Sequence, residues 1–384
     1  MPLASRRFVR SFVIGSVLGA AGFVVAEALR PRPGQARILD WDDIAARAHS
    51  RLEDEPGFDA RRRKRIEAGY AALVKDVEEP FLRFVGGLPP GASMPPFQAL
   101  DRHGWIDLNL AVLRDGLEPV LQLQHGIPNT RALDLTRSAV DRYVATLLGF
   151  LAHRVLGQYD PQLLGREPTV EPGLYLVEPN IEGWQEEAEL PAEPLRRWLI
   201  LHEMTHAWQF SANPWLRGYL NSMITTLIGA AVDRKAAPLD RLLGLTFGIR
   251  AQMQVVGKVQ AVMSLVEGYS NLVMSVVGRE QIPEFEMLET AHRRRSGEKT
   301  IPERLFWRLT GLELKLQQYV IGEAFCRAVY EKEGLAALNR AWEGPETLPT
   351  MAELREPELW LRRVRPVKTI AAGGGARRRR PRSA

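Results

Sequence analysis

Cysteine is almost absent from this chain of 384 residues, which contains a single one, Cys326. One cysteine excludes an intramolecular disulfide, a zinc finger built on cysteines and an iron–sulfur cluster held by several thiolates. It leaves the compartment open, because a protein without disulfides can work on either side of a membrane. Repeats with a period of 20–50 residues are also missing, which argues against a solenoid. Apolar residues make up 45% and charged residues 25% of the chain, a balance that excludes a disordered chain, a collagen-like repeat and a polytopic membrane protein.

A basic excess is missing from the body of the chain, although the whole sequence carries a net charge of +5. Residues 1–35 carry +4 and residues 371–384 carry +5, which leaves −4 for residues 36–370. A nucleic-acid-binding domain presents a basic surface. We therefore expect no specific nucleic-acid partner, and the mildly acidic body argues against a role through the arginines of the tail.

Charged residues are missing from Ser11 to Ala26 as well. A helix over residues 11–28 would be about 27 Å long at ~1.5 Å per residue, close to the ~30 Å hydrocarbon core of a bilayer. The segment 1–35 is therefore predicted to be a membrane anchor. Two alternatives are an export signal cleaved after the A-x-A sequence Ala26-Glu27-Ala28 and an amphipathic helix docked on the domain.

The arginines on either side of the apolar segment indicate how it would be oriented in a membrane. Three arginines precede the apolar segment and two follow it, which slightly favours a cytoplasmic N-terminus. We thus expect membrane association through residues 11–28; this slight bias favours the extracytoplasmic side for the main domain but leaves both sides of the membrane open. Residues 367–384 contain a run of four arginines after a stretch of alanine and glycine, and this composition predicts a disordered tail.

Helical periodicity dominates residues 36–366, which we treat as one domain because no linker interrupts them. The pattern predicts one or two helices over 58–85, a buried helix over 138–156, another over 194–210, and three or four further helices between 214 and 340. The best strand candidate is Leu174-Tyr175-Leu176-Val177, bounded by Gly173 and Pro179. The predicted fold class is therefore mainly α, an α+β arrangement with minimal β.

The predicted helix 194–210 contains the motif His202-Glu203-Met204-Thr205-His206, that is H-E-x-x-H. Histidines four residues apart lie about 40° apart around a helix, so both imidazoles can bind one metal ion. Glu203 is close enough to hold a metal-bound water and take its proton as general base, and zinc lowers the pKa of such a water towards ~7. The expected cofactor is Zn²⁺. Two histidines packed beside a surface glutamate are the alternative, but apolar residues flank the motif, and buried polar groups need partners.

A catalytic zinc needs a third protein ligand and an open coordination position. The downstream acids include Asp233, Glu267, Glu280, Glu313 and Glu323. Glu267 is the best placed, because it lies in the apolar helical run 259–277, where an unpaired carboxylate is costly. A pair with a buried arginine or lysine is the alternative for this residue. Asn271 lies four residues further on the same helical face, where its amide oxygen could accept the Nδ1–H of a ligand histidine.

The motif and its surroundings resemble a zincin-like metallopeptidase family that is linked to biosynthesis of the deazaflavin coenzyme F-420. The resemblance covers most of residues 36–366. It includes Asp101-Arg102, Trp105-Ile106, Asn109, Val155-Leu156-Gly157-Gln158-Tyr159-Asp160, Pro179-Asn180-Ile181, His202 to Phe210, Pro214-Trp215-Leu216, Arg241 to Leu245, Met263 to Gly268, Lys315, Gln318-Tyr319, Gly322, Phe325, Asn339, Trp342, Pro345 to Pro349, Trp360-Leu361 and Arg363-Val364. Two positions depart from the family: Tyr269 replaces a histidine, and Asn271 replaces a usual acid. Tyr269 lies about 200° round the helix from Glu267, so we expect it to face away from the metal.

The resemblance implies a mainly helical zincin-like fold and a zinc hydrolase. The leading hypothesis is a peptidase or amide hydrolase whose zinc is held by His202, His206 and Glu267, with Glu203 as general base and a peptide or protein as substrate. The alternative is a non-catalytic, zinc-containing scaffold or chaperone-like membrane-associated protein. The intact Glu203 argues against this alternative, since metal ligation alone does not need it.

Overall fold

A computed structural model describes residues 39–52, 55–122, 131–160, 173–232, 238–297 and 313–365. The apolar segment 11–28 and the Arg-rich tail 367–384 lie outside these residues, so the predictions made for them stay predictions.

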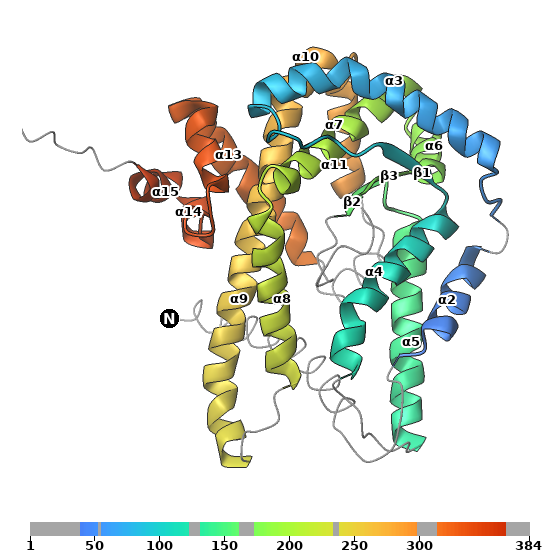
Figure 1. Ribbon diagram of the computed structural model, residues 1–384, viewed down its shortest axis with the longest axis vertical. Helices are drawn as coiled ribbons and strands as arrows, with labels where there is room; N and C mark the ends of the chain where they lie inside the picture. The colour runs from blue at the N-terminus through green and yellow to red at the C-terminus, as the bar shows by residue number, and fades with distance from the viewer. Residues whose placement is uncertain are drawn as a thin grey trace, which may run out of the picture.

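Helices make up most of the described chain, and one small sheet accompanies them (Figure 1). The α-helices are α2 (Trp41–His49), α3 (Ala60–Val85), α4 (Arg102–Gln122), α5 (Arg131–Ala152), α6 (Glu178–Glu187), α7 (Ala192–Ser211), α8 (Trp215–Val232), α9 (Pro238–Val273), α10 (Arg279–Gln281), α11 (Phe285–Gly297), α13 (Glu313–Asn339), α14 (Met351–Arg355) and α15 (Pro357–Val364). Short 3₁₀ turns cover Ser50–Leu52 and Arg340–Trp342, and a π-helix, Met274–Gly278, continues α9. The mainly α fold class is confirmed.

The segment 58–85, for which the sequence allows one or two helices, forms the single helix α3 (Figure 1). Asp59 caps its start, because the Asp59 side chain accepts a hydrogen bond from the Arg62 backbone N–H at 2.6 Å. Gly86 ends the helix in the left-handed conformation at φ 96°. Pro80 lies inside the helix without ending it.

The sheet has the strand order β1-β3-β2. The central strand β3 (Gly173–Val177) pairs in parallel with β1 (Phe97–Leu100) and antiparallel with β2 (Gly157–Asp160), with Leu174 opposite Phe97 and Tyr159. All five residues of β3 are buried, which confirms the predicted strand 174–177. The sequence analysis missed β1 and β2, because a strand of four residues is too short to show a clear period.

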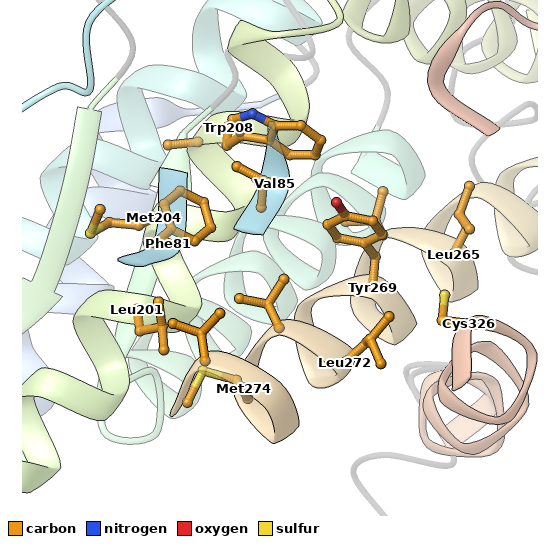
Figure 2. Packing of buried hydrophobic residues seen from close by; sticks show 14 of the residues in the cluster. Phe81, Val85, Leu201, Met204, Trp208, Leu265, Tyr269, Leu272, Met274 and Cys326 are labelled. Carbon is orange, nitrogen blue, oxygen red and sulfur yellow. The ribbon is translucent and has the colours of Figure 1, made fainter. Parts of the chain in front are cut away.

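The main core forms where α7 packs between α3 and α9. Figure 2 shows Met204 and Trp208 of α7 beside Phe81 and Val85 of α3, with Tyr269 of α9 next to them. The Tyr269 ring stacks on that of Trp208, with centroids 5.5 Å apart. A second, smaller cluster joins α2, α4 and α5. The core therefore fixes α7, which carries the H-E-x-x-H motif, against α9, which carries Glu267.

One helical stretch among the described residues, Met253–Gln281, has the length and apolar composition of a membrane span. Most of it is buried inside the protein, as in the core helix of a globular domain.

Candidate metal centre

The H-E-x-x-H motif lies in the second half of α7, a helix of 20 residues. The helix starts after Pro191, whose extended backbone suits an N-cap position. Most apolar residues around the motif on this helix are buried: Leu195, Trp198, Leu199, Ile200, Leu201, Met204, Ala207 and Trp208. His202 and His206 are themselves only partly exposed, so their polar atoms need partners inside the protein.

His202 and His206 turn their Nε2 atoms toward each other, 3.2 Å apart, with their ring planes at 90°. The ring of Trp198 stacks on that of His202, with centroids 5.9 Å apart and planes within 3°. Burial, together with the nearby His206 and His292, lowers the pKa of His202 well below its ordinary value. This shift favours the neutral imidazole, the form that binds a metal.

Glu267 reaches the same point from α9. Its Oε2 is 3.7 Å from Nε2 of His206, and one ligand atom from each of His202, His206 and Glu267 lies within 4.8 Å of the others. In the described part of the chain, Glu267 forms its ion-pair contact with His206 and not with an arginine or lysine. The structure thus brings together the three residues predicted as ligands, and their role as ligands stays a prediction.

A close contact between α9 and α13 supports the position of Glu267. A Cβ on Gly322 of α13 would lie 1.8 Å from the Ser264 backbone oxygen, and a Cβ on Gly268 would lie 2.1 Å from the Gly322 carbonyl carbon. Only glycine allows two backbones to approach this closely. Since Gly268 follows Glu267 directly, this contact fixes the backbone that presents the carboxylate.

Glu203 lies against β2 and is only 7% exposed. The Tyr159 backbone N–H donates a hydrogen bond to its carboxylate, and a Cβ on Gly157 would lie 2.6 Å from its Oε1. Burial raises the pKa of Glu203 to about 7, with Glu267 acting in the same direction and His206 and the Tyr159 N–H opposing it. A carboxyl group with this pKa can accept and donate a proton at neutral pH.

Two residues that the sequence analysis missed hold the histidine rings. Oε1 of Gln209 is 3.0 Å from Nδ1 of His206, and Nε2 of Gln209 donates to the Val266 carbonyl at 2.8 Å. Ser270 Oγ is 3.0 Å from Nδ1 of His202. Gln209 follows His206 by three residues, so helical spacing was a signal for it. Ser270 belongs to another helix, and no spacing within the motif could identify it.

The expectation that Asn271 accepts a histidine Nδ1–H is wrong. Asn271 lies one turn beyond Glu267 and turns toward α13, where its Nδ2 donates to Glu323 Oε2 at 3.4 Å. Tyr269 does face away from the metal group, as expected: its hydroxyl donates to Asn339 Oδ1 at 2.9 Å.

Two of the other acids that were considered as ligands are described, and neither belongs to the group of His202, His206 and Glu267. Glu280 belongs to the short helix α10, and Glu323 pairs with Arg327 one turn along α13. Asp233 and the side chain of Glu313 lie outside the described residues.

A mainly helical fold, with an H-E-x-x-H helix at its core and a glutamate supplied by a second helix, defines a zincin-like site. The chain belongs to the zincin-like metallopeptidase family, which matches residues 39–361, as the sequence resemblance predicted. It is also similar to a crystal structure from Chloroflexus aurantiacus described as a candidate hydrolase with a novel fold. That protein is 34% identical, with 85% of this chain and 98% of the other covered and a TM-score of 0.65. A search of curated proteins found no match. The family and this structure support a hydrolase, and the family implies a metal, usually zinc.

Proposed function

We propose that this protein is a zinc-dependent hydrolase that cleaves a peptide or amide bond in a peptide or protein substrate. One observation carries the proposal: His202, His206 and Glu267 offer ligand atoms within 4.8 Å of one another, and the buried carboxylate of Glu203 lies beside them. Membership of the metallopeptidase family supports it.

The residues present fit a zinc ion. Two imidazoles and one carboxylate form a ligand set of catalytic zinc sites, which keep a coordination position open for water or substrate. Both histidines have a hydrogen-bond partner at Nδ1, which leaves Nε2 as the atom that would bind the metal. When bound, zinc would polarise the carbonyl group of the substrate and lower the pKa of a water at the open position.

Glu203 would carry the proton transfers. Its carboxylate accepts a proton from the attacking water and then donates this proton to the leaving nitrogen. The strand β2 keeps the carboxylate in place, because the Tyr159 N–H bonds to it and Gly157 leaves room for it. Burial of an acidic group such as Glu203 destabilises the fold. A role in proton transfer would explain why the carboxylate is buried nevertheless.

The alternative is a scaffold or chaperone-like membrane protein that keeps zinc without catalysis. Ligation alone requires His202, His206 and Glu267 but gives no role to Glu203. The link to biosynthesis of coenzyme F-420 is proposed on the sequence resemblance alone, and it does not make the coenzyme the substrate.

Substitution of the general base tests the proposed function. Glu203→Gln keeps the helix and almost the same side-chain shape but removes the group that accepts a proton. We expect this variant to bind about one zinc per chain, like the wild type, and to lose about 10²–10⁴-fold in the rate of cleavage. Metal analysis gives the zinc content, circular dichroism the fold, and a broad peptide-cleavage profile of the wild type supplies the substrate for the rate.

Glu193→Gln is the matched control, because Glu193 lies on the exposed first turn of the same helix and pairs with Arg197 at the surface. It should keep both zinc and activity. If Glu203→Gln cleaves the substrate at the wild-type rate, the proposed metallopeptidase function is refuted. Zinc would then have a structural role. Equal zinc content in wild type and Glu267→Ala would reassign the third ligand.

A further inference from the structure

Gln209 connects the two helices that carry the predicted ligands. It lies on α7 one turn after His206 and has no exposed surface. Its side-chain amide lies between Nδ1 of His206, 3.0 Å from its Oε1, and the backbone carbonyl of Val266, 2.8 Å from its Nε2. Val266 directly precedes Glu267 on α9. One buried side chain therefore contacts the ring of one predicted ligand and the backbone next to another.

The amide of Gln209 has only one orientation that satisfies both contacts. The Val266 carbonyl oxygen can only accept a hydrogen bond, so the NH₂ group of Gln209 must face it. The amide oxygen then faces His206, and this oxygen can also only accept. Nδ1 of His206 must therefore carry the hydrogen, which leaves the lone pair of the neutral ring on Nε2. This is the nitrogen that lies 3.2 Å from Nε2 of His202 and 3.7 Å from Glu267 Oε2.

The hydrogen-bond contact of the other histidine, His202, does not select one tautomer. Ser270 Oγ, 3.0 Å from Nδ1 of His202, belongs to a hydroxyl group that can donate or accept. The Ser270 contact is therefore compatible with either tautomer of His202, whereas the Gln209 contact is compatible with one tautomer of His206.

We propose that Gln209 is a positioning residue that sets the tautomer of His206 before metal binds, through an amide oriented by the Val266 carbonyl. The proposal rests on the proposed function, in which Nε2 of His206 is a zinc ligand. Its consequence for affinity follows from the general behaviour of metal-bound histidines, whose outer hydrogen-bond partners typically contribute 10–100-fold to metal binding.

Two substitutions of Gln209 distinguish hydrogen bonding from packing. Gln209→Leu keeps the approximate volume but cannot accept the Nδ1–H. Gln209→Glu keeps an acceptor oxygen toward His206 and serves as the conservative variant. Thr205→Val is the matched control, because Thr205 is fully buried on the same helix and its hydroxyl donates to the Leu201 carbonyl and not to a histidine ring.

The tautomer is measured in the full-length protein after chelation of its metal, by long-range ¹H–¹⁵N correlation spectra of the imidazoles. A His206→Asn variant assigns the signals. We expect hydrogen on Nδ1 of His206 in the wild type, in Gln209→Glu and in Thr205→Val, and a substantial population with hydrogen on Nε2 in Gln209→Leu. Competition between the protein and a chelator for Zn²⁺ alone should show about 10–100-fold weaker binding by Gln209→Leu and wild-type binding by Thr205→Val.

Hydrogen on Nε2 of His206 in the wild-type protein would overturn the proposal, and so would Gln209→Leu with the wild-type tautomer and zinc affinity. A loss of zinc affinity in Thr205→Val as large as in Gln209→Leu would also overturn it, because packing would then explain both. Failure of the proposed function looks different. In that case the wild type shows hydrogen on Nδ1, and the Gln209→Leu tautomer shifts as expected, but neither protein binds zinc.

Discussion

Gly157 of β2 and Glu203 of α7 approach each other so closely that position 157 has no room for a side chain. A Cβ there would lie 2.6 Å from Oε1 of Glu203 and 2.9 Å from its Cδ and Cγ. We expect Gly157→Ala to displace the carboxylate and lower the rate of peptide cleavage about 10²-fold, since a misplacement of about 1 Å can have this effect. Zinc content should stay at the wild-type level, because the three predicted ligands are other side chains. Steady-state rates and metal analysis check the two halves of this prediction.

Gly183→Ala is the control for Gly157→Ala. Gly183 lies within α6, and nothing lies within 4 Å of a Cβ added there, so its variant should cleave like the wild type. A wild-type rate in Gly157→Ala would mean that β2 does not position the Glu203 carboxylate.

At the scale of the elements, the close packing of α9 against α13 depends on Gly268 and Gly322. A Cβ on Gly322 would lie 1.8 Å from a backbone oxygen of α9, and backbone cannot move aside as a flexible side chain does. We expect Gly322→Ala to lower the free energy of unfolding by about 1–3 kcal/mol or more, the usual cost of overpacking. Urea denaturation measures this change. Zinc affinity should fall too, because Glu267 lies next to the displaced contact.

Gly257→Ala tests whether the effect belongs to the helix contact. Gly257 lies on α9, with nothing within 4 Å of an added Cβ. Alanine there should raise helix stability by about 1 kcal/mol, the difference in helix propensity between the two residues. If Gly322→Ala unfolds at the same urea concentration as the wild type, the two helices can separate without cost and the contact does not position Glu267.

At the scale of the whole molecule, we propose that residues 11–28 anchor the protein in a membrane. The full-length chain should then fractionate with membranes and stay there at high salt, while residues 36–384 should be soluble. The reason is that burial of an apolar helix in lipid does not depend on ionic strength, whereas contacts between arginine and anionic lipid are screened by salt. Fractionation of both proteins at low and high salt measures the difference.

Two outcomes would contradict the anchor. Release of the full-length protein by salt alone would assign the membrane contact to the arginines at the ends of the chain. A mature N-terminus at Leu29 would instead show that the segment is an export signal cleaved after Ala28.

The features that the sequence by itself determined are local. His202 and His206 share one helical face because an α-helix turns once in 3.6 residues, whatever surrounds it. The helices α3, α5 and α7 and the strand β3 follow from patterns within single segments. Glu267 was identified because a carboxylate within an apolar helix needs a partner, although its convergence with the histidines appears only in the folded chain.

The tertiary structure decided which residues from different segments are in contact. Gln209 and Val266 are 57 residues apart, and Ser270 and His202 are 68 apart, so their contacts depend on how α7 and α9 cross. The same crossing excluded Asn271, which helical spacing had favoured. The strands β1 and β2 are four residues each and form because β3 lies between them. The pattern within one segment predicts which face of that segment is buried. It does not predict which other segment packs against this face, because the pairing depends on packing of the whole core.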